Sequence, residues 1–174
     1  MAEQQQAVAP DLAVDIAAHA AVFAVVDDWR ELRGGAVNPT AAEEGVGEKN
    51  EDDDAAERLK EKCIPIINAV GPAGATPLIV ACLQDDRARA EALLALGADP
   101  AAEGDLRTIS DPTKKYKLFP LAVAARGGFI AIVKLLLTHA QLSVNQASTD
   151  GGRTALLVGC GEGRTAVVKL LLFP

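Results

Sequence analysis

The densest group of glycines in the chain is GCGEGRT, residues 159–165, and a glycine-rich turn of this type can wrap a phosphate group. A phosphate loop, however, needs the spacing GxxxxGK[ST] after a strand, with a lysine that reaches the phosphates. Residues 159–165 contain no lysine, and a helical pattern surrounds them. Gly163 is therefore interpreted as a turn between two helices, and Gly159 as a small residue where helices pack closely.

Nucleophilic or metal chemistry would need cysteines and histidines near a base or near one another. Cys63, Cys82 and Cys160 show no CxxC spacing, so neither a zinc site nor a disulfide framework is predicted. Cys82 and Cys160 fall in apolar segments, and we expect both to be buried. His19 and His139 are the only histidines, and His19 lies on an apolar helix face where a packed side chain is expected. The sequence predicts no catalytic constellation, metal or cofactor.

Composition favours a helical, acidic protein. Hydrophobic residues make up 49% of the 174 residues but aromatic residues only 3%, which argues against a sandwich or barrel. With 17 basic and 24 acidic residues the net charge is −7, so a nucleic-acid binder is not expected. The most apolar run, 16–26, is about half the length that spans a bilayer. No membrane association is expected, and an intracellular location, cytoplasmic or nuclear, is predicted.

Charge is distributed unevenly along the chain. Residues 1–73 contain 15 acidic and 6 basic residues, whereas the remainder contains 9 acidic and 11 basic residues. The acidic run at 41–57 has no hydrophobic periodicity, and it lacks the ligand spacing of a calcium-binding loop. We therefore divide the chain into an N-terminal helical segment at 1–40, an acidic linker or insertion at 41–54 and a repeat array at 55–174.

The second half of the chain contains three similar segments. They are TPLIVACLQDDRARAEALLALGAD at 76–99, FPLAVAARGGFIAIVKLLLTHA at 119–140 and TALLVGCGEGRTAVVKLLLFP at 154–174. Equivalent residues lie 43 and then 35 positions apart. One such unit cannot bury its own apolar face, so the copies are expected to stack.

Each copy predicts a short helix, a tight turn and a second helix. Thr76 and Thr154 suit the N-cap position, where the hydroxyl accepts a hydrogen bond from the first turn. Pro77 and Pro120 suit the first helical position, where no amide hydrogen is missed. Gly128 is suited to the turn that ends the first helix.

These segments resemble the ankyrin repeat family, whose pattern is roughly GxTPLHxAAxxGHxxVVxLLLxxGADxN with a period of about 33 residues. The resemblance rests on GATPLIVACL and LLALGAD in 74–99, FPLAVAARGG and IVKLLL in 119–137, and GGRTALLVGCGEG and VVKLLL in 151–172. It implies an all-α, helix-turn-helix solenoid of about two full repeats and a truncated third, preceded by a degenerate helical part. The copies would lie near 74–105, 117–147 and 150–174.

The sequence departs from the family pattern in three ways. The histidine of the pattern is replaced by Ile79, Ala122 and Leu157. The first copy has Arg89 and Ala90 where the pattern has two valines. The third copy stops before its closing loop, so the array would end on an exposed leucine row. We expect either a truncated chain or an end covered by a partner or a second copy, so self-association through this end is predicted.

Two interpretations of residues 12–38 stay open. Asp11 and Gly34 suit the start and end of one continuous helix. Alternatively, AAHAAVFAVV at 17–26 aligns with AARGGFIAIV at 124–133, which would make this stretch a degenerate repeat. Residues 55–63 predict another helix, ending before Pro65.

The connection between the first two copies is about ten residues longer than the family spacing. The extra stretch, 104–117, carries four cations and the only tyrosine: Arg107, Lys114, Lys115, Lys117 and Tyr116. Because insertions in repeat proteins often lie on the binding face, this loop predicts a contact site for an acidic partner. A tolerated surface insertion is the alternative.

The resemblance also implies which residues of the helices face a partner, because ankyrin domains usually bind proteins through loop tips and the concave face. By register these include Leu83, Gln84, Arg126, Arg153 and Glu162. The predicted function is therefore a non-catalytic protein–protein interaction module. The alternative is a substrate-recruiting fragment of a larger signalling or ubiquitin-pathway enzyme.

Overall fold

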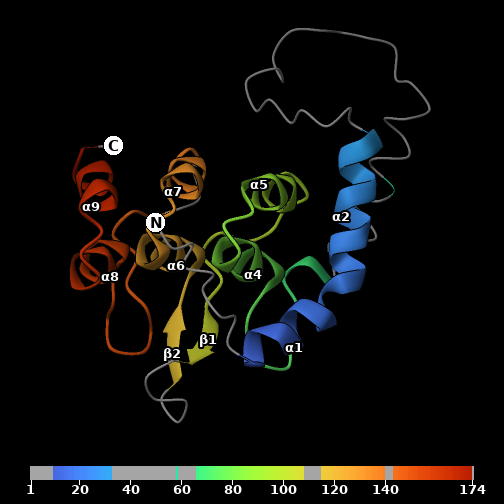
Figure 1. The fold of residues 1–174 in the computed structure, drawn as a ribbon, viewed down its shortest axis with the longest axis horizontal. Coiled ribbons are helices and arrows are strands. Elements are labelled where there is room, and N and C mark those ends of the chain that lie inside the picture. The colour runs from blue at the N-terminus through green and yellow to red at the C-terminus, as the bar shows by residue number, and fades with distance from the viewer. Residues whose placement is uncertain (1–9, 33–57, 59–65, 108–114, 140–142, 174) are drawn as a thin grey trace, which may run out of the picture.

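The computed structural model describes residues 10–32, 58, 66–107, 115–139 and 143–173. Helices dominate these residues and stack in two rows (Figure 1). The inner row consists of α4 (Pro77–Leu83), α6 (Pro120–Gly127) and α8 (Ala155–Gly161); the outer row consists of α5 (Arg87–Ala95), α7 (Ile130–Leu137) and α9 (Thr165–Leu172). Each helix packs on the next helix of its row and on its partner in the other row. The three similar segments therefore form three helix pairs.

The predicted helix starts are confirmed. The Thr76 hydroxyl accepts a hydrogen bond from the Ile79 amide at 3.3 Å, and the Thr154 hydroxyl accepts one from the Leu157 amide at 3.2 Å. The middle helix pair has no such cap, because the buried side chain of Phe119 takes the equivalent position. Hydrogen bonding thus fixes the first and third inner helices, while the middle one is anchored by apolar packing.

A left-handed residue connects the two helices of each pair. This residue is Asp85 (φ 55°) in the first pair, Gly128 (φ 84°) in the second and Gly163 (φ 67°) in the third. Glycine adopts this conformation without steric cost, and aspartate is among the few other residues that tolerate it. The turn predicted from the glycines is therefore present, and Asp85 adopts it as well.

The prediction that both Cys82 and Cys160 are buried is half wrong. Cys82, in α4, is fully buried. This burial raises the pKa of its thiol, and the Asp85 carboxylate makes a smaller contribution in the same direction. Cys160 occupies the equivalent position in α8 but is exposed. The difference arises because no helix of the described residues stacks on the far side of α8.

Two short strands depart from the all-α expectation. The strands β1 (Gly104–Arg107) and β2 (Lys115–Leu118) pair antiparallel, with Gly104 opposite Leu118 and Asp105 opposite Lys117. The resulting hairpin projects from between the first and second helix pairs (Figure 1). The long connection between the first two copies was expected to be a loop, but its described residues form these two paired strands. Because side chains alternate along a strand, Leu106 and Leu118 can point into the core.

The N-terminal segment forms two helices, α1 (Pro10–Ala18) and α2 (Ala20–Leu32), with a break at His19. The interpretation of this stretch as one continuous helix is therefore wrong. α1 packs on α4 and α2 on α5, so each row gains a helix. Unlike α5, which lies back over α4, α2 leads away from α1 at a clear angle (Figure 1). The degenerate-repeat interpretation stays a prediction.

Two buried polar side chains, Asp15 of α1 and His19 directly after α1, contact the start of the first repeat. The two carboxylate oxygens of Asp15 accept hydrogen bonds from the Ala73 and Ala75 amides, at 2.7 and 2.8 Å. The His19 ring nitrogen Nε2 lies 2.9 Å from the Ala75 carbonyl oxygen and donates to it. Asp15 and His19 are four residues apart, and together they supply the hydrogen-bond partners of the loop that leads into α4.

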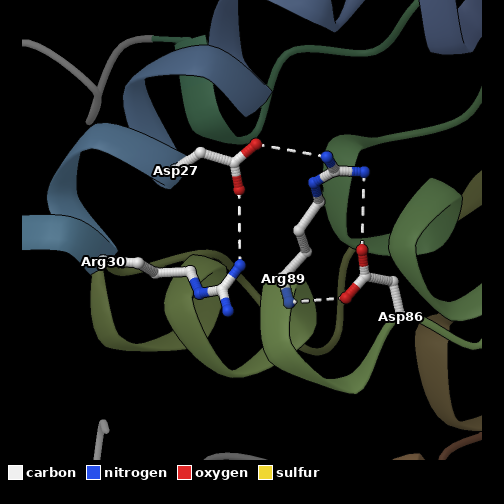
Figure 2. Close-up of polar contacts among 4 residues, drawn as sticks. All are labelled: Asp27, Arg30, Asp86 and Arg89. Atoms are coloured by element: carbon white, nitrogen blue, oxygen red, sulfur yellow. Dashed lines mark hydrogen bonds and ion pairs between the residues drawn. The ribbon is translucent and has the colours of Figure 1, made fainter. Parts of the chain in front are cut away.

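Charged side chains join α2 to α5 (Figure 2). The Arg89 guanidinium contacts the carboxylates of Asp27 at 3.1 Å and Asp86 at 3.4 Å, and it lies 5.1 Å from the centre of the Phe23 ring. Arg30 contacts Asp27 at 3.5 Å. Arg89 replaces a valine of the repeat pattern, and its charge serves this contact with α2.

Two sequence predictions fall largely outside the described residues. The acidic segment 41–54 is one, and of the predicted helix at 55–63 only Arg58 is described. Within the part of the chain that the structure describes, every helix is too short to cross a membrane.

Candidate functional site

The alternation of β2 divides the predicted basic and aromatic cluster between two faces. Successive strand residues point to opposite sides, so Tyr116 and Leu118 share one face while Lys115 and Lys117 share the other. Both lysines are exposed, Tyr116 is half-buried and Leu118 is buried. The sequence-based interpretation missed this division because it treated the segment as a loop.

Arg153 covers the ring of Tyr116. The central guanidinium carbon of Arg153 lies 3.9 Å from the centre of the ring, which is a cation–π contact. The backbone of Arg153 is fixed by Ser148, because the Arg153 amide donates to the Ser148 hydroxyl at 3.1 Å and the Arg153 carbonyl accepts from the Ser148 amide at 2.9 Å. The turn before α8 thus places this cation against the hairpin.

A second arginine crosses from α6 to α8. Arg126 Nε lies 3.5 Å from Glu162 Oε1, and these side chains are 28% and 47% exposed. The Arg126 carbonyl accepts a hydrogen bond from Arg164 Nε at 3.0 Å, which fixes the end of α6. Since Glu162 neutralises part of the charge on Arg126, the two arginines of this surface are not equivalent.

These side chains border an open groove of about 310 Å³ between the hairpin and the inner helices. We call it the hairpin groove, and its lining residues are Tyr116, Leu118, Arg126, Arg153, Leu157, Val158, Gly161 and Glu162. It combines two cations, one carboxylate, one aromatic ring and several aliphatic side chains. The structure therefore brings together four of the residues predicted to contact a partner: Tyr116, Arg126, Arg153 and Glu162.

The other predicted contact residues lie elsewhere. Lys115 and Lys117 occupy the opposite face of β2. Leu83 is partly buried against the core and Gln84 is exposed at the end of α4, outside the groove lining. Lys114 and the side chain of Arg107 lie outside the described residues.

Of the two groove residues that the sequence interpretation missed, Leu157 and Val158, Leu157 is the more exposed. Its side chain is 58% exposed, whereas the equivalent Ile79 and Ala122 are fully buried. The end of the Ile79 side chain lies beside Gly104 of the hairpin, and α4 and α6 each pack on the next inner helix. The described residues provide no such helix after α8. The signal was present, since Leu157 is a large apolar residue in the last of three copies.

A comparison with known families agrees with this architecture. Residues 103–174 match a family model described as ankyrin repeats (3 copies). This part of the chain belongs to the ankyrin repeat family. The matched range includes the hairpin, the second and third helix pairs and the whole hairpin groove, and α4 with α5 continues the same two rows before it. Ankyrin repeats are in general protein–protein interaction modules.

Among the residues that the structure describes, no group of three or more His, Cys, Asp or Glu side chains could hold a metal ion. Burial raises the pKa of Asp85, but this carboxyl lies at the turn after α4 and does not line the groove. The chemistry that the groove offers is therefore hydrogen bonding, charge pairing and apolar contact.

Proposed function

We propose that the ankyrin array is a non-catalytic module that binds a protein partner in the hairpin groove. The observation that carries this proposal is the stacked pair of Tyr116 and Arg153 beside the exposed Leu157. Aromatic residues and arginine dominate the energetics of protein interfaces, and an exposed leucine next to them supplies apolar area. Because the groove is held by hydrogen-bonded backbone and stacked helices, little ordering entropy is lost when it binds.

We infer further that the partner is acidic. Arg153 and Arg126 border the groove, and Lys115 and Lys117 are exposed on the other face of the same hairpin. Such a distribution attracts a negatively charged surface and accelerates its association, even though the whole chain carries a net charge of −7. An intracellular location, cytoplasmic or nuclear, stays a prediction.

The test is a comparison of capture by matched variants. The full chain and a Tyr116→Ala, Arg153→Glu variant are used to isolate binding proteins from a cell extract, and each protein is then purified and titrated by calorimetry. We expect the groove variant to lose a partner that a Lys134→Glu, Lys169→Glu control retains, because Lys134 and Lys169 are exposed on outer helices. Equal binding of the partner by the full chain and both variants would show that the binding site lies outside the groove.

The alternative function, substrate recruitment for a larger signalling or ubiquitin-pathway enzyme, would use the same groove. The identity of the captured protein separates the two proposals, because a recruited substrate would carry the modification that the enzyme introduces. A partner that is itself unmodified would favour the scaffold function.

Self-association through the C-terminal end is a second, separate proposal. Leu172 is 53% exposed and Phe173 is 80% exposed at the end of α9, and Cys160 of α8 is also exposed. Sedimentation velocity of the full chain and of a Leu172→Gln, Phe173→Ser variant tests it. A concentration-dependent dimer that the variant abolishes is the expected result, and a monomer at all concentrations would contradict it.

A further inference from the structure

Arg153 differs from the other arginines that border the helix pairs. Arg89 contacts two carboxylates, Arg126 contacts Glu162, and Arg164 donates to a backbone carbonyl. Within the described residues the Arg153 guanidinium has no hydrogen bond or ion pair to an acceptor, and it stacks on the Tyr116 ring. Its face is covered, and the N–H groups on its edge remain available to a ligand.

We propose that Arg153, oriented by Tyr116, recognises one carboxylate on an extended segment of the partner, beside an aliphatic residue that packs on Leu157 and Val158. This inference rests on the proposed function and adds the chemical class of the bound segment. The segment carries Asp or Glu at one position and Leu, Ile or Val two positions away.

The geometry of Arg153 favours a carboxylate. A guanidinium presents paired N–H donors in its plane, which match the two oxygens of a carboxylate. Stacking on Tyr116 restricts the rotation of this plane, so less side-chain entropy is lost when the ligand binds. The aromatic ring therefore acts as a positioning residue for the cation.

The charges of the hairpin groove favour a single negative charge. Glu162 already engages Arg126, so Arg153 is the one groove cation without a carboxylate among the described residues. A phosphate group carries nearly two charges and would meet repulsion from Glu162. One side-chain carboxylate matches the charge that is available.

The shape of the groove favours an extended segment with an adjacent aliphatic side chain. Leu118, Leu157 and Val158 supply its apolar surface, and its volume of about 310 Å³ is at the small end of ligand pockets. In an extended peptide, side chains two positions apart point to the same side. Because the groove is open, the peptide chain passes through it, and an internal side chain rather than a chain end supplies the carboxylate.

The experiment selects random linear peptides on the full chain and then measures the affinity of one selected peptide by fluorescence polarisation. We expect enrichment of an acidic residue two positions from an aliphatic one. Arg153→Lys keeps the charge but loses the paired donors, so affinity should fall about tenfold. Replacement of the peptide's own acid by its amide should cause a similar fall without touching the protein fold.

Two further variants separate positioning from packing. Tyr116→Ala should weaken binding of the acidic peptide by a larger factor than binding of its amide analogue, because the ring lines the groove and also orients Arg153. Glu162→Gln should strengthen binding about two- to fivefold, since a nearby negative charge is removed. Lys134→Ala and Lys169→Ala are the matched controls and should change nothing.

Several results would overturn the inference. Selected peptides that need the groove but contain no acid would overturn it and leave the proposed function intact. If amidation of the peptide C-terminus abolished binding, the recognised group would be the terminal carboxylate and not an internal side chain, which also contradicts the inference. A requirement for a phosphorylated residue would likewise overturn it. Peptides insensitive to every groove variant would overturn both the inference and the proposed function.

Discussion

The two ends of the ankyrin array treat equivalent positions differently. At the N-terminal end α1 and α2 cover the first helix pair, and Ala75 at its start is only 1% exposed. At the C-terminal end the third pair leaves Leu157 and Phe173 exposed. Ile79 and Leu157 occupy the same repeat position, yet one is fully buried and the other is 58% exposed.

The difference shows that place in the stack, more than repeat position, decides burial. The N-terminal end is closed by polar groups, namely the Asp15 carboxylate, the His19 ring and the Arg89 guanidinium. Arg89 stands where the later copies have Ile132 and Val167, both buried. The chain thus has a charged residue at this position where the neighbouring helix is α2, whereas the second and third copies have an apolar residue there.

The largest expected effect is the difference between Ile79→Ala and Leu157→Ala. Ile79→Ala should lower the free energy of unfolding by about 3–4 kcal/mol, because it removes a fully buried side chain and leaves a cavity. Leu157→Ala should cost less than about 1 kcal/mol, because its side chain is already largely in water. Urea denaturation of both variants measures the contrast, and equal losses would mean that Leu157 is buried in solution, for example by a second copy.

Asp15→Ala comes next in size. It removes the acceptor for two backbone amides in a buried position, so stability should fall by about 2–3 kcal/mol. Asp28→Ala, at an exposed position of α2, is the control and should change stability by less than about 0.5 kcal/mol. If Asp15→Ala unfolds no more easily than the control, α1 does not close the N-terminal end.

Sequence reasoning predicted the repeated helix pairs but not what happens at their ends. Thr76, Pro77 and Gly128 act locally, so their roles in starting and ending helices could be derived from the chain alone. The contacts of Asp15 with residues nearly 60 positions away, and of Arg89 with Asp27, depend on tertiary packing that no local pattern encodes.

The candidate site was predictable in its residue types and less so in its geometry. Arg126, Arg153 and Glu162 were found through repeat register and Tyr116 through the long connection between the first two copies, and all four line the groove. Lys115 and Tyr116 lie on opposite faces because they are neighbours in a β-strand. This separation was not predicted, because short polar strands have a weak sequence pattern. The role of Leu157 in the groove could not be predicted without the structure, which shows that no further helix of the described residues packs on the third helix pair.

A double-mutant cycle sharpens the account of the N-terminal end. Arg89→Ala and Asp27→Ala should show a coupling of about 0.5–1 kcal/mol in the free energy of unfolding, since the pair is close but partly exposed. The coupling should shrink in concentrated salt. Arg87 and Glu91 on α5 provide the control pair with weaker coupling, because they are 4.0 Å apart and the Arg87 side chain is 61% exposed. Zero coupling for Arg89 and Asp27 would leave apolar packing as the contact between α2 and α5.

A similarly small effect is expected at Gly159, interpreted from sequence as a site of close packing. A Cβ atom added there would lie 3.5 Å from Val168 Cγ2 and 3.9 Å from Ala125 Cβ, which are ordinary contact distances. The equivalent residues, Ala81 and Ala124, already carry this carbon and are fully buried. Gly159→Ala should therefore stabilise the protein by about 0.5–1 kcal/mol, because alanine favours the helix over glycine.

Gly163→Ala is the matched control for Gly159→Ala. Gly163 adopts a φ of 67°, so alanine there should destabilise by about 1 kcal/mol although nothing obstructs its Cβ. Thermal unfolding of the two variants measures opposite signs for the same substitution. A loss of stability at Gly159 would mean that α8 and α9 approach more closely than the equivalent helices of the first two copies. In that case the third helix pair would differ from the others in its internal packing as well as in its exposure.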